Sequence, residues 1–236
     1  MAKLGEALRA AVSEDSSVEE GVAAWSALMN SNRRRVFEYV AWRPCATTGE
    51  VARALEVSDP TAAWHLRKLV EAGYVQPMRQ GRRVVFHAAS LGLEATEAAG
   101  LAALSEADAA SILQFVLATP GLTAAELAAK VTRATAQRPI RALLSAGLIV
   151  RIVDGRYRRY YPGSLASSME RTAPRRLRDF RRRLVRRLVH DRLSPEVRAA
   201  PGETVEIDLR FGEERATMRL PAGSLLAGRM GQGTFI

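Results

Sequence analysis

Residues 47–89 read TTGEVARALEVSDPTAAWHLRKLVEAGYVQPMRQGRRVVFHAA, and this stretch decides the fold. Thr47 and Glu50 stand at the spacing of a capping box, in which the two side chains close the first turn of a helix. Ser58 is a favoured helix cap, and the proline two residues later suits a first helical turn. The sequence therefore predicts a short helix to about residue 55 and a second helix over 59–72.

A basic-tipped hairpin is predicted directly after this second helix. Gly73 ends the helix, because glycine adopts the left-handed conformation that closes helices at little cost. Two short β-like runs over 74–88 then flank a predicted turn at residues 80–81. With that turn Arg79 lies opposite Arg82, so the base of the hairpin is apolar and its tip is positively charged.

A further helix is predicted over Arg33–Trp42, ahead of these elements, with Asn32 as its cap and an apolar side. Three helices followed by a hairpin with a basic tip are typical of a winged helix-turn-helix. The expected unit covers residues 31–90.

The same pattern occurs twice in the chain. Residues 36–54 align with 112–130 at 5 identical positions of 19, and residues 58–90 align with 132–164 at 9 of 33. An internal repeat of this kind predicts that one supersecondary unit was used twice. The second unit is expected over 108–164.

The second unit departs from the first at two places. Pro139 stands where the first unit has His65, and proline in a helix predicts a late start or a kink. A turn at Asp154-Gly155 is predicted for its hairpin, which places Arg151 opposite Arg158 and three arginines on one face. The second unit is therefore expected to be the poorer reader of DNA bases.

The chain of 236 residues carries a formal charge of +10, a balance that indicates an anionic partner such as nucleic acid. Arginine outnumbers lysine 32 to 3, which suits phosphate and guanine recognition but also follows from a GC-rich genome. The single Cys45 excludes an internal disulfide framework. Without a signal peptide or an apolar run of 18 residues, the expected location is the cytoplasm, at the nucleoid.

Residues 47–89 resemble the ArsR/MarR-type winged helix of prokaryotic transcriptional regulators. Residues 154–164, DGRYRRYYPGS, resemble the wing of archaeal proteins that carry two such domains in tandem. The resemblance covers about residues 31–164. It implies that the third helix enters the major groove and that the wing contacts the adjacent backbone or minor groove.

The resemblance implies a set of DNA-contacting positions in the first unit. They are Ser58, Thr61, Ala62, Trp64, His65, Lys68, Arg79, Arg82 and Arg83. Trp64 departs from the family, where a small polar residue is common at this place, and packing against the preceding helix is an alternative role. The paired cysteines of the metal-sensing members are missing, so no metal or other cofactor is expected.

An arginine-rich segment, Pro174–Leu193, follows the second unit. Four apolar side chains at spacings of 3, 4 and 4 predict an amphipathic helix, and nine arginines cover its other faces. The alternatives are phosphate contact, a dimer or interdomain helix, and a membrane-surface helix. The additional candidate DNA contacts are Arg138, Arg141, Arg151, Arg156, Arg158, Arg175, Arg176, Arg182 and Arg183.

Both ends of the chain contain further predicted elements. Residues 205–220 alternate between apolar and polar side chains around a turn, which predicts a β-hairpin with one apolar face. Because two strands are not stable alone in water, that face must dock on the chain or on a partner. A capping box at Ser17–Glu20 predicts a helix through about Met29, which would dimerise or pack on the unit that follows.

The expected fold is mainly α with small β-hairpins (α+β): two tandem winged helices, an Arg-rich helix and a C-terminal hairpin. The predicted boundaries are 1–30, 31–90, 91–107 (linker), 108–164, 165–193 and 194–236.

The expected function is a DNA-binding transcriptional regulator, with double-stranded DNA as partner and a homodimer left open. A nucleoid protein that coats DNA and a protein–protein scaffold are the alternatives. No phosphate-binding loop, nucleophile elbow or zinc spacing is present, so neither an enzyme nor a membrane partner is expected.

Overall fold

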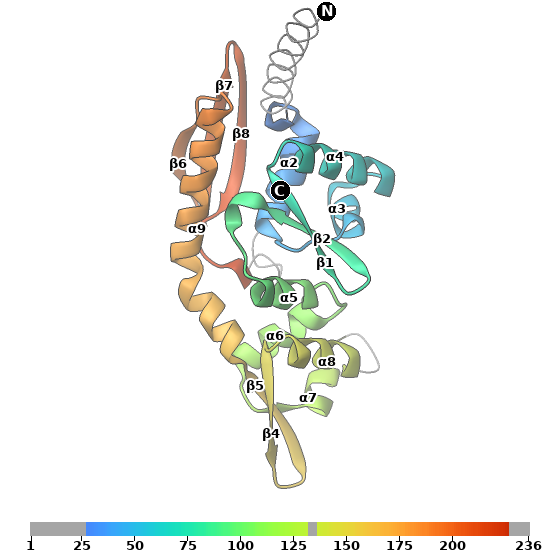
Figure 1. Cartoon of the computed structure of the whole chain (residues 1–236). Helices are drawn as coiled ribbons and strands as arrows, with labels where there is room; N and C mark the ends of the chain where they lie inside the picture. The colour runs from blue at the N-terminus through green and yellow to red at the C-terminus, as the bar shows by residue number, and fades with distance from the viewer. Residues whose placement is uncertain (1–26, 132–135, 227–236) are drawn as a thin grey trace, which may run out of the picture.

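The computed structural model describes residues 27–131 and 136–226. Two compact sets of elements lie one above the other along a single long helix, α9 (Ser164–His190), and a C-terminal sheet packs beside the upper set (Figure 1). We call residues 31–90 unit 1 and residues 108–164 unit 2. The mixed α+β class expected from the sequence is confirmed.

Unit 1 contains three helices and a hairpin, in the order of a winged helix-turn-helix. Its elements are α2 (Ser31–Trp42), α3 (Thr48–Leu55), α4 (Asp59–Glu71), β1 (Val75–Gln80) and β2 (Arg83–Ala88). The capping box of α3 and the Ser58 cap of α4 are present as predicted. The predicted cap of α2 was wrong. Asn30 accepts the hydrogen bond from the Arg33 amide at 3.1 Å, so the helix starts two residues before the position predicted from Asn32.

Both wings turn one residue later than predicted. In unit 1 Gln80 pairs with Arg83 and Arg79 with Val84, so the turn residues are 81–82. Gly81 has φ +59 and Arg82 is not among the residues with positive φ. That combination suits a turn with glycine at its first central position, whereas the predicted turn placed glycine second. Each residue of the first strand therefore pairs two positions further along the second strand than predicted. Because side chains alternate between the two faces of a strand, a shift of two leaves each side chain on its predicted face.

Unit 2 repeats the order of helices and hairpin. Its elements are α6 (Ala109–Ala118), β3 (Leu122–Thr123), α7 (Ala124–Ala129), α8 (Gln137–Ser145), β4 (Ile149–Asp154) and β5 (Tyr157–Pro162). The late start predicted for its third helix is confirmed, because α8 begins at Gln137. Pro139 therefore lies in the first turn, where its missing N–H needs no partner. The hairpin pairs Asp154 with Tyr157 and turns at 155–156.

The segment between the units is not a plain linker. It contains the short helix η1 (Ala89–Leu91) and the helix α5 (Ala95–Ala103), whose start is closed by a capping box of Glu94 and Glu97. Pattern analysis missed α5 because its alanine-rich sequence has no distinct apolar stripe. This helix packs against α8 and α9 and so joins unit 1 to unit 2.

Two apolar cores hold the molecule together, and α9 contributes to both. Its predicted stripe of Leu177, Phe180, Leu184 and Leu188 is buried in the core of unit 1, and its first turns, with Ala166 and Met169, are buried in the core of unit 2. Val85 of β2 and Cys45 also lie in the core of unit 2, although both belong to the sequence of unit 1.

The C-terminal element is a three-stranded antiparallel sheet, not the predicted two-stranded hairpin. Its strands are β6 (Glu196–Ala200), β7 (Thr204–Phe211) and β8 (Glu214–Pro221), in the order β6-β7-β8. Strand β6 was missed because it is mostly exposed and has no apolar alternation.

The predicted apolar face of this sheet docks on the core of unit 1. The Arg219 amide of edge strand β8 donates to Glu38 of α2 at 2.7 Å, and the Trp42 indole donates to the Arg219 carbonyl at 3.1 Å. The predicted N-terminal helix lies outside the described residues except for Ala27–Met29.

Candidate nucleic-acid interface

The exposed side of α4 is a narrow polar strip beside the first wing. Ser58 caps the helix, and its hydroxyl lies 2.8 Å from the Thr61 hydroxyl. Thr61, Trp64 and Arg67 follow at helical spacing and are exposed, with Trp64 44% exposed despite its size. The Trp64 ring also packs edge-on against His65, with ring centroids 4.9 Å apart, so both predicted roles of this residue stay open.

Two positions predicted to face the groove are buried. Ala62 is 0% exposed and His65 is 7% exposed, because both lie on the side of α4 that packs into the core. Burial, followed by the charge of Arg33, lowers the pKa of the His65 imidazole. Neither residue can contact DNA in this structure, so their assignment as DNA contacts was wrong.

Arg67 also lies on the exposed strip, three residues after Trp64. From the sequence it was open to DNA contact or to a solvated helix face, and its exposure fits both. Glu71 lies at the end of the strip, 2.7 Å from the Lys68 ammonium and 3.8 Å from the Arg67 Nε. These pairs are exposed and so weak that a phosphate group can replace the carboxylate.

An acidic residue joins the first wing to unit 2. The Glu106 carboxylate lies 3.1 Å from Arg83 of β2 and 2.9 Å from Arg138 of α8. Two residues that the sequence predicted as independent DNA contacts therefore share one carboxylate. The other wing arginines, Arg79 and Arg82, project into solvent.

The predicted arginines of unit 2, Arg141, Arg151, Arg156 and Arg158, are all exposed. Arg151 and Arg158 remain on one face of the second wing, where Arg158 pairs with Val153. Arg156 donates to the Tyr157 hydroxyl at 2.7 Å and lies over its ring. This wing extends well beyond the body of the molecule (Figure 1).

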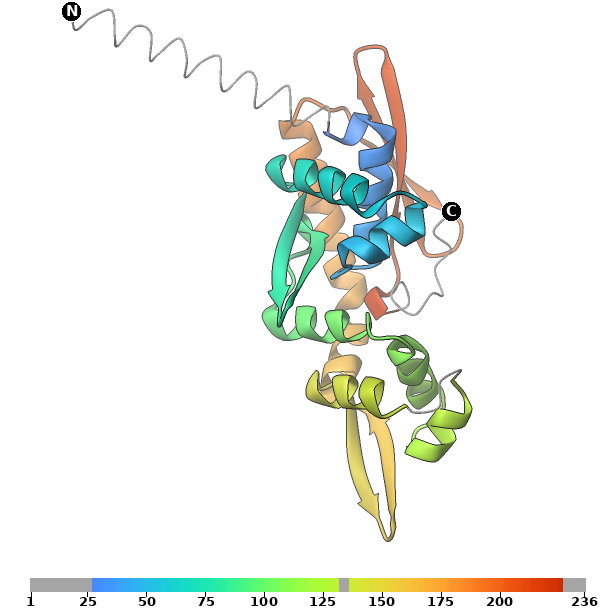
Figure 2. The same cartoon turned by 90° about the vertical axis from the view of Figure 1, so that its right-hand side faces the viewer.

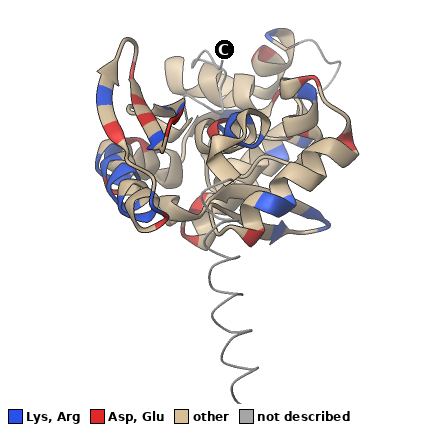
Figure 3. Ribbon diagram, turned by 90° about the horizontal axis from the view of Figure 1, so that it is seen from above, with Lys and Arg blue, Asp and Glu red and all other residues tan. Residues whose placement is uncertain are grey.

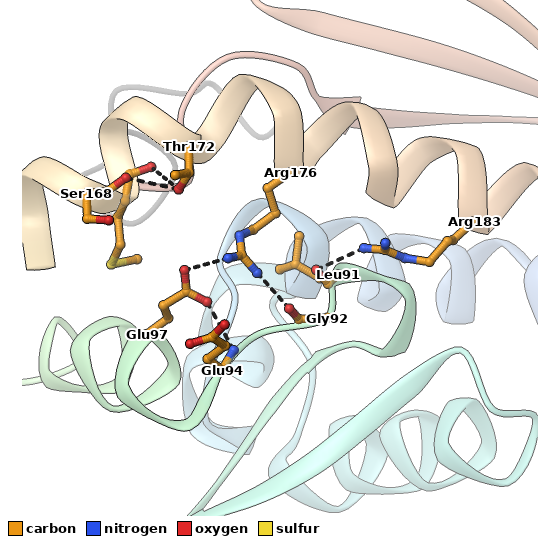
Figure 4. Close-up of polar contacts among 9 residues, drawn as sticks. Leu91, Gly92, Glu94, Glu97, Ser168, Thr172, Arg176 and Arg183 are labelled. Atoms are coloured by element: carbon orange, nitrogen blue, oxygen red, sulfur yellow. Dashed lines mark hydrogen bonds and ion pairs between the residues drawn. The ribbon is translucent and has the colours of Figure 1, made fainter.

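The arginines of α9 divide into two groups. Arg176 donates to the Gly92 carbonyl and the Glu97 carboxylate, each at 2.6 Å (Figure 4). Arg183 donates to the Ser90 carbonyl at 2.8 Å and to the Leu91 carbonyl at 3.3 Å, and Figure 4 shows the bond to Leu91. These two side chains hold the chain segment at the end of unit 1, residues 90–97, against α9. The prediction that they contact DNA therefore conflicts with their intrachain bonds. Arg175 and Arg182 are exposed and make no bond to unit 1; Arg182 pairs with Asp179 of the same helix.

The described parts of the chain contain no group of three or more His, Cys, Asp or Glu residues placed to hold a metal ion. Within those same residues, no helix has both the length and the apolar character needed to cross a membrane.

Residues 28–75 match the helix-turn-helix domain family, a stretch that contains α2, α3 and α4. The chain is also 40% identical over 72 residues to the HTH-type transcriptional regulator Rv2034 of Mycobacterium tuberculosis. That alignment covers 30% of this chain and 66% of the relative, so the chain spans slightly less than two thirds of the protein it matches.

Among the solved structures that resemble this chain is the solution structure of the homodimeric winged helix-turn-helix DNA-binding domain Mb0332 from Mycobacterium bovis, described as a possible ArsR-family transcriptional regulator. The similarity covers 32% of this chain and 69% of that chain, with 22% identity and a TM-score of 0.29. At this level it carries no argument about the chain.

Proposed function

We propose that this protein is a DNA-binding transcriptional regulator in which α4 enters the major groove and the first wing lies on the adjacent backbone. The observation that carries the proposal is the exposed strip of α4, with Thr61, Trp64 and Arg67, beside the exposed arginines of the wing; α4 lies inside a segment that matches a helix-turn-helix family. The name of the M. tuberculosis relative agrees with this role.

Unit 2 acts in this proposal as a second winged helix in tandem with the first. Its third helix and its wing carry exposed arginines, and α8 lies on the same side of α9 as α4 (Figures 1 and 2). α8 is shorter than α4 and has Pro139 in its first turn, so in this proposal unit 2 supplies phosphate contacts more than base contacts. A homodimer would double this arrangement and belongs to the same proposal.

Selection from random-sequence duplexes tests the proposal. The expected result is a defined motif whose binding weakens steeply with salt. Enrichment without a motif would support the alternative of a nucleoid protein that coats DNA. The exposed arginines of both wings and of α9 favour this alternative. Absence of duplex binding at low salt would contradict both and leave the protein–protein scaffold.

Two sets of variants separate base reading from backbone binding. Thr61→Ala and Trp64→Ala are expected to change the selected motif, because their side chains face the groove. Arg79→Ala combined with Arg82→Ala is expected to weaken binding to all sequences alike and to flatten the log–log salt slope by about 1.8. An unchanged motif in both α4 variants would remove α4 from base recognition.

A further inference from the structure

Five arginines form a continuous row on the outer face of α9. Arg171, Arg175, Arg178, Arg182 and Arg186 follow one another at spacings of 4, 3, 4 and 4, which places them on one side of a helix. That side is opposite the buried stripe containing Leu177 and Phe180. All five are exposed, and we call them the basic stripe.

Within the described residues, most of the basic stripe is not neutralised. Arg182 pairs with Asp179 at 2.7 Å, but the other four make no hydrogen bond or ion pair with the residues that the structure describes. By contrast, Arg176, Arg183 and Arg187 of the same helix all turn toward unit 1. In the part of the chain that the structure describes, four positive charges on the outer face therefore have no carboxylate partner, and such a row of charges suits an anionic partner.

The shape of the stripe fits a nucleic-acid backbone. It spans residues 171–186 of the helix, about 22 Å at the usual rise, whereas duplex DNA carries one negative charge per about 1.7 Å of its axis. Each guanidinium can bind a phosphate with two parallel hydrogen bonds. An amphipathic membrane helix would need its apolar side for the lipid, and on α9 that side is buried in the protein.

The stripe and α4 lie on opposite sides of the molecule. In Figure 1 α9 is at the left and α4 at the right of unit 1, and in Figure 2 α9 lies behind the helices of both units. Figure 3 shows the concentration of basic residues along α9, away from the helices of unit 1. Duplex DNA is stiff over far more than the width of one domain, so a segment seated on α4 cannot also follow the outer face of α9.

We propose that the basic stripe is a second, sequence-independent binding surface for duplex DNA, through which one chain bridges two DNA segments. Binding of the first DNA segment, by α4 and the wings, rests on the proposed function. Binding of the second DNA segment, by the basic stripe, requires only phosphate groups. Bridging of this kind would let a regulator bring distant sites of a chromosome together.

A capture experiment tests the bridge. A duplex carrying the selected motif is fixed to beads, and a fluorescent duplex of unrelated sequence is added with the full-length protein. The stripe variant combines Arg171→Gln, Arg178→Gln and Arg186→Gln. A matched control combines Arg198→Gln, Arg210→Gln and Arg215→Gln, which removes the same charge from the C-terminal sheet.

The wild-type protein and the control are expected to capture the fluorescent duplex. The stripe variant is expected to stay on the beads but to lose capture by about tenfold or more. Its salt slope for unrelated duplex should fall by up to about 2.7, the value for three lost phosphate contacts. Equal capture by the stripe variant, or equal loss in the control, overturns the proposal.

Two further outcomes distinguish failure of the proposed function from failure of this inference. If the wild-type protein does not prefer the motif on the beads but binds unrelated duplex through the stripe, the proposed function fails while the second surface stands. If the stripe instead binds vesicles of phosphatidylcholine and phosphatidylglycerol and no duplex, the second surface serves a membrane, and the inference fails while the proposed function stands.

Discussion

Glu106 is the residue whose position most affects the expected DNA affinity. Its carboxylate serves both Arg83 and Arg138, whose side chains are 51% and 75% exposed. Exposed ion pairs contribute at most about 1 kcal/mol each to folding, so their role in stability is small. They do, however, compete with phosphate for both arginines. In our proposal Glu106 fixes the first wing relative to α8 and, at the same time, weakens the binding of Arg83 and Arg138 to phosphate.

Glu106→Gln is therefore expected to bind duplex more tightly, with a salt slope steeper by up to about 1.8 and an almost unchanged melting temperature. Fluorescence anisotropy over a salt series measures the slope. Glu213→Gln, at the exposed turn of the C-terminal sheet, is the control for the loss of one negative charge. If both variants bind alike, Glu106 has no specific effect on the two arginines.

His65 and His87 make the stability of the protein depend on pH. Burial lowers the pKa of both imidazoles; at His65 the charge of Arg33 adds to this, and at His87 a bond to the Ala88 carbonyl opposes it. The unfolded chain, with histidine pKa values near about 6.5, then binds more protons than the folded chain. Stability is therefore full above about pH 6.5 and is lost as the pH falls through that value toward the lower folded-state pKa values.

Urea denaturation at a series of pH values measures this effect. The double variant His65→Gln, His87→Gln is expected to lose less stability between about pH 6.5 and pH 5 than the wild-type protein. His190→Gln, which replaces an exposed histidine, is the control. A wild-type stability that does not change across this interval would contradict the assignment of neutral, buried imidazoles.

At the scale of elements, α9 combines a structural and a binding role on opposite faces. Phe180 is completely buried in the core of unit 1, so Phe180→Ala is expected to cost about 3–5 kcal/mol of unfolding free energy. Arg178→Ala on the outer face should stay within about 0.5 kcal/mol of wild type. Chemical denaturation measures both changes. A cost below about 1 kcal/mol for Phe180→Ala would show that α9 is not required by the core.

At the scale of the whole molecule, the two units share their cores. Val85 and Cys45 from the sequence of unit 1 are buried in the core of unit 2, and α9 contributes to both cores. We therefore expect one cooperative unfolding transition, with equal calorimetric and van't Hoff enthalpies. Val85→Ala should lower the temperature of that single transition. Two separate transitions in scanning calorimetry would indicate independent units instead.

Features that depend on neighbouring residues could be predicted before the structure was known. The capping boxes at Thr47 and Thr123, the Ser58 cap and the late start of α8, which has Pro139 in its first turn, all depend on residues within one helical turn. The internal repeat likewise predicted the repeated order of the elements. These features were readable because the residues that decide them lie within a few positions of one another.

Only the tertiary structure decided which side of each element meets solvent. His65 and Ala62 were assigned to the groove through the family resemblance, which does not reveal which neighbours cover them in this chain. The partners of Arg176 lie 79 and 84 positions away, at Glu97 and Gly92, and those of Arg83 and Arg138 meet at Glu106. Burial and pairing across such separations are set by the packing of whole elements, so local spacing could not determine which arginines remain free for DNA.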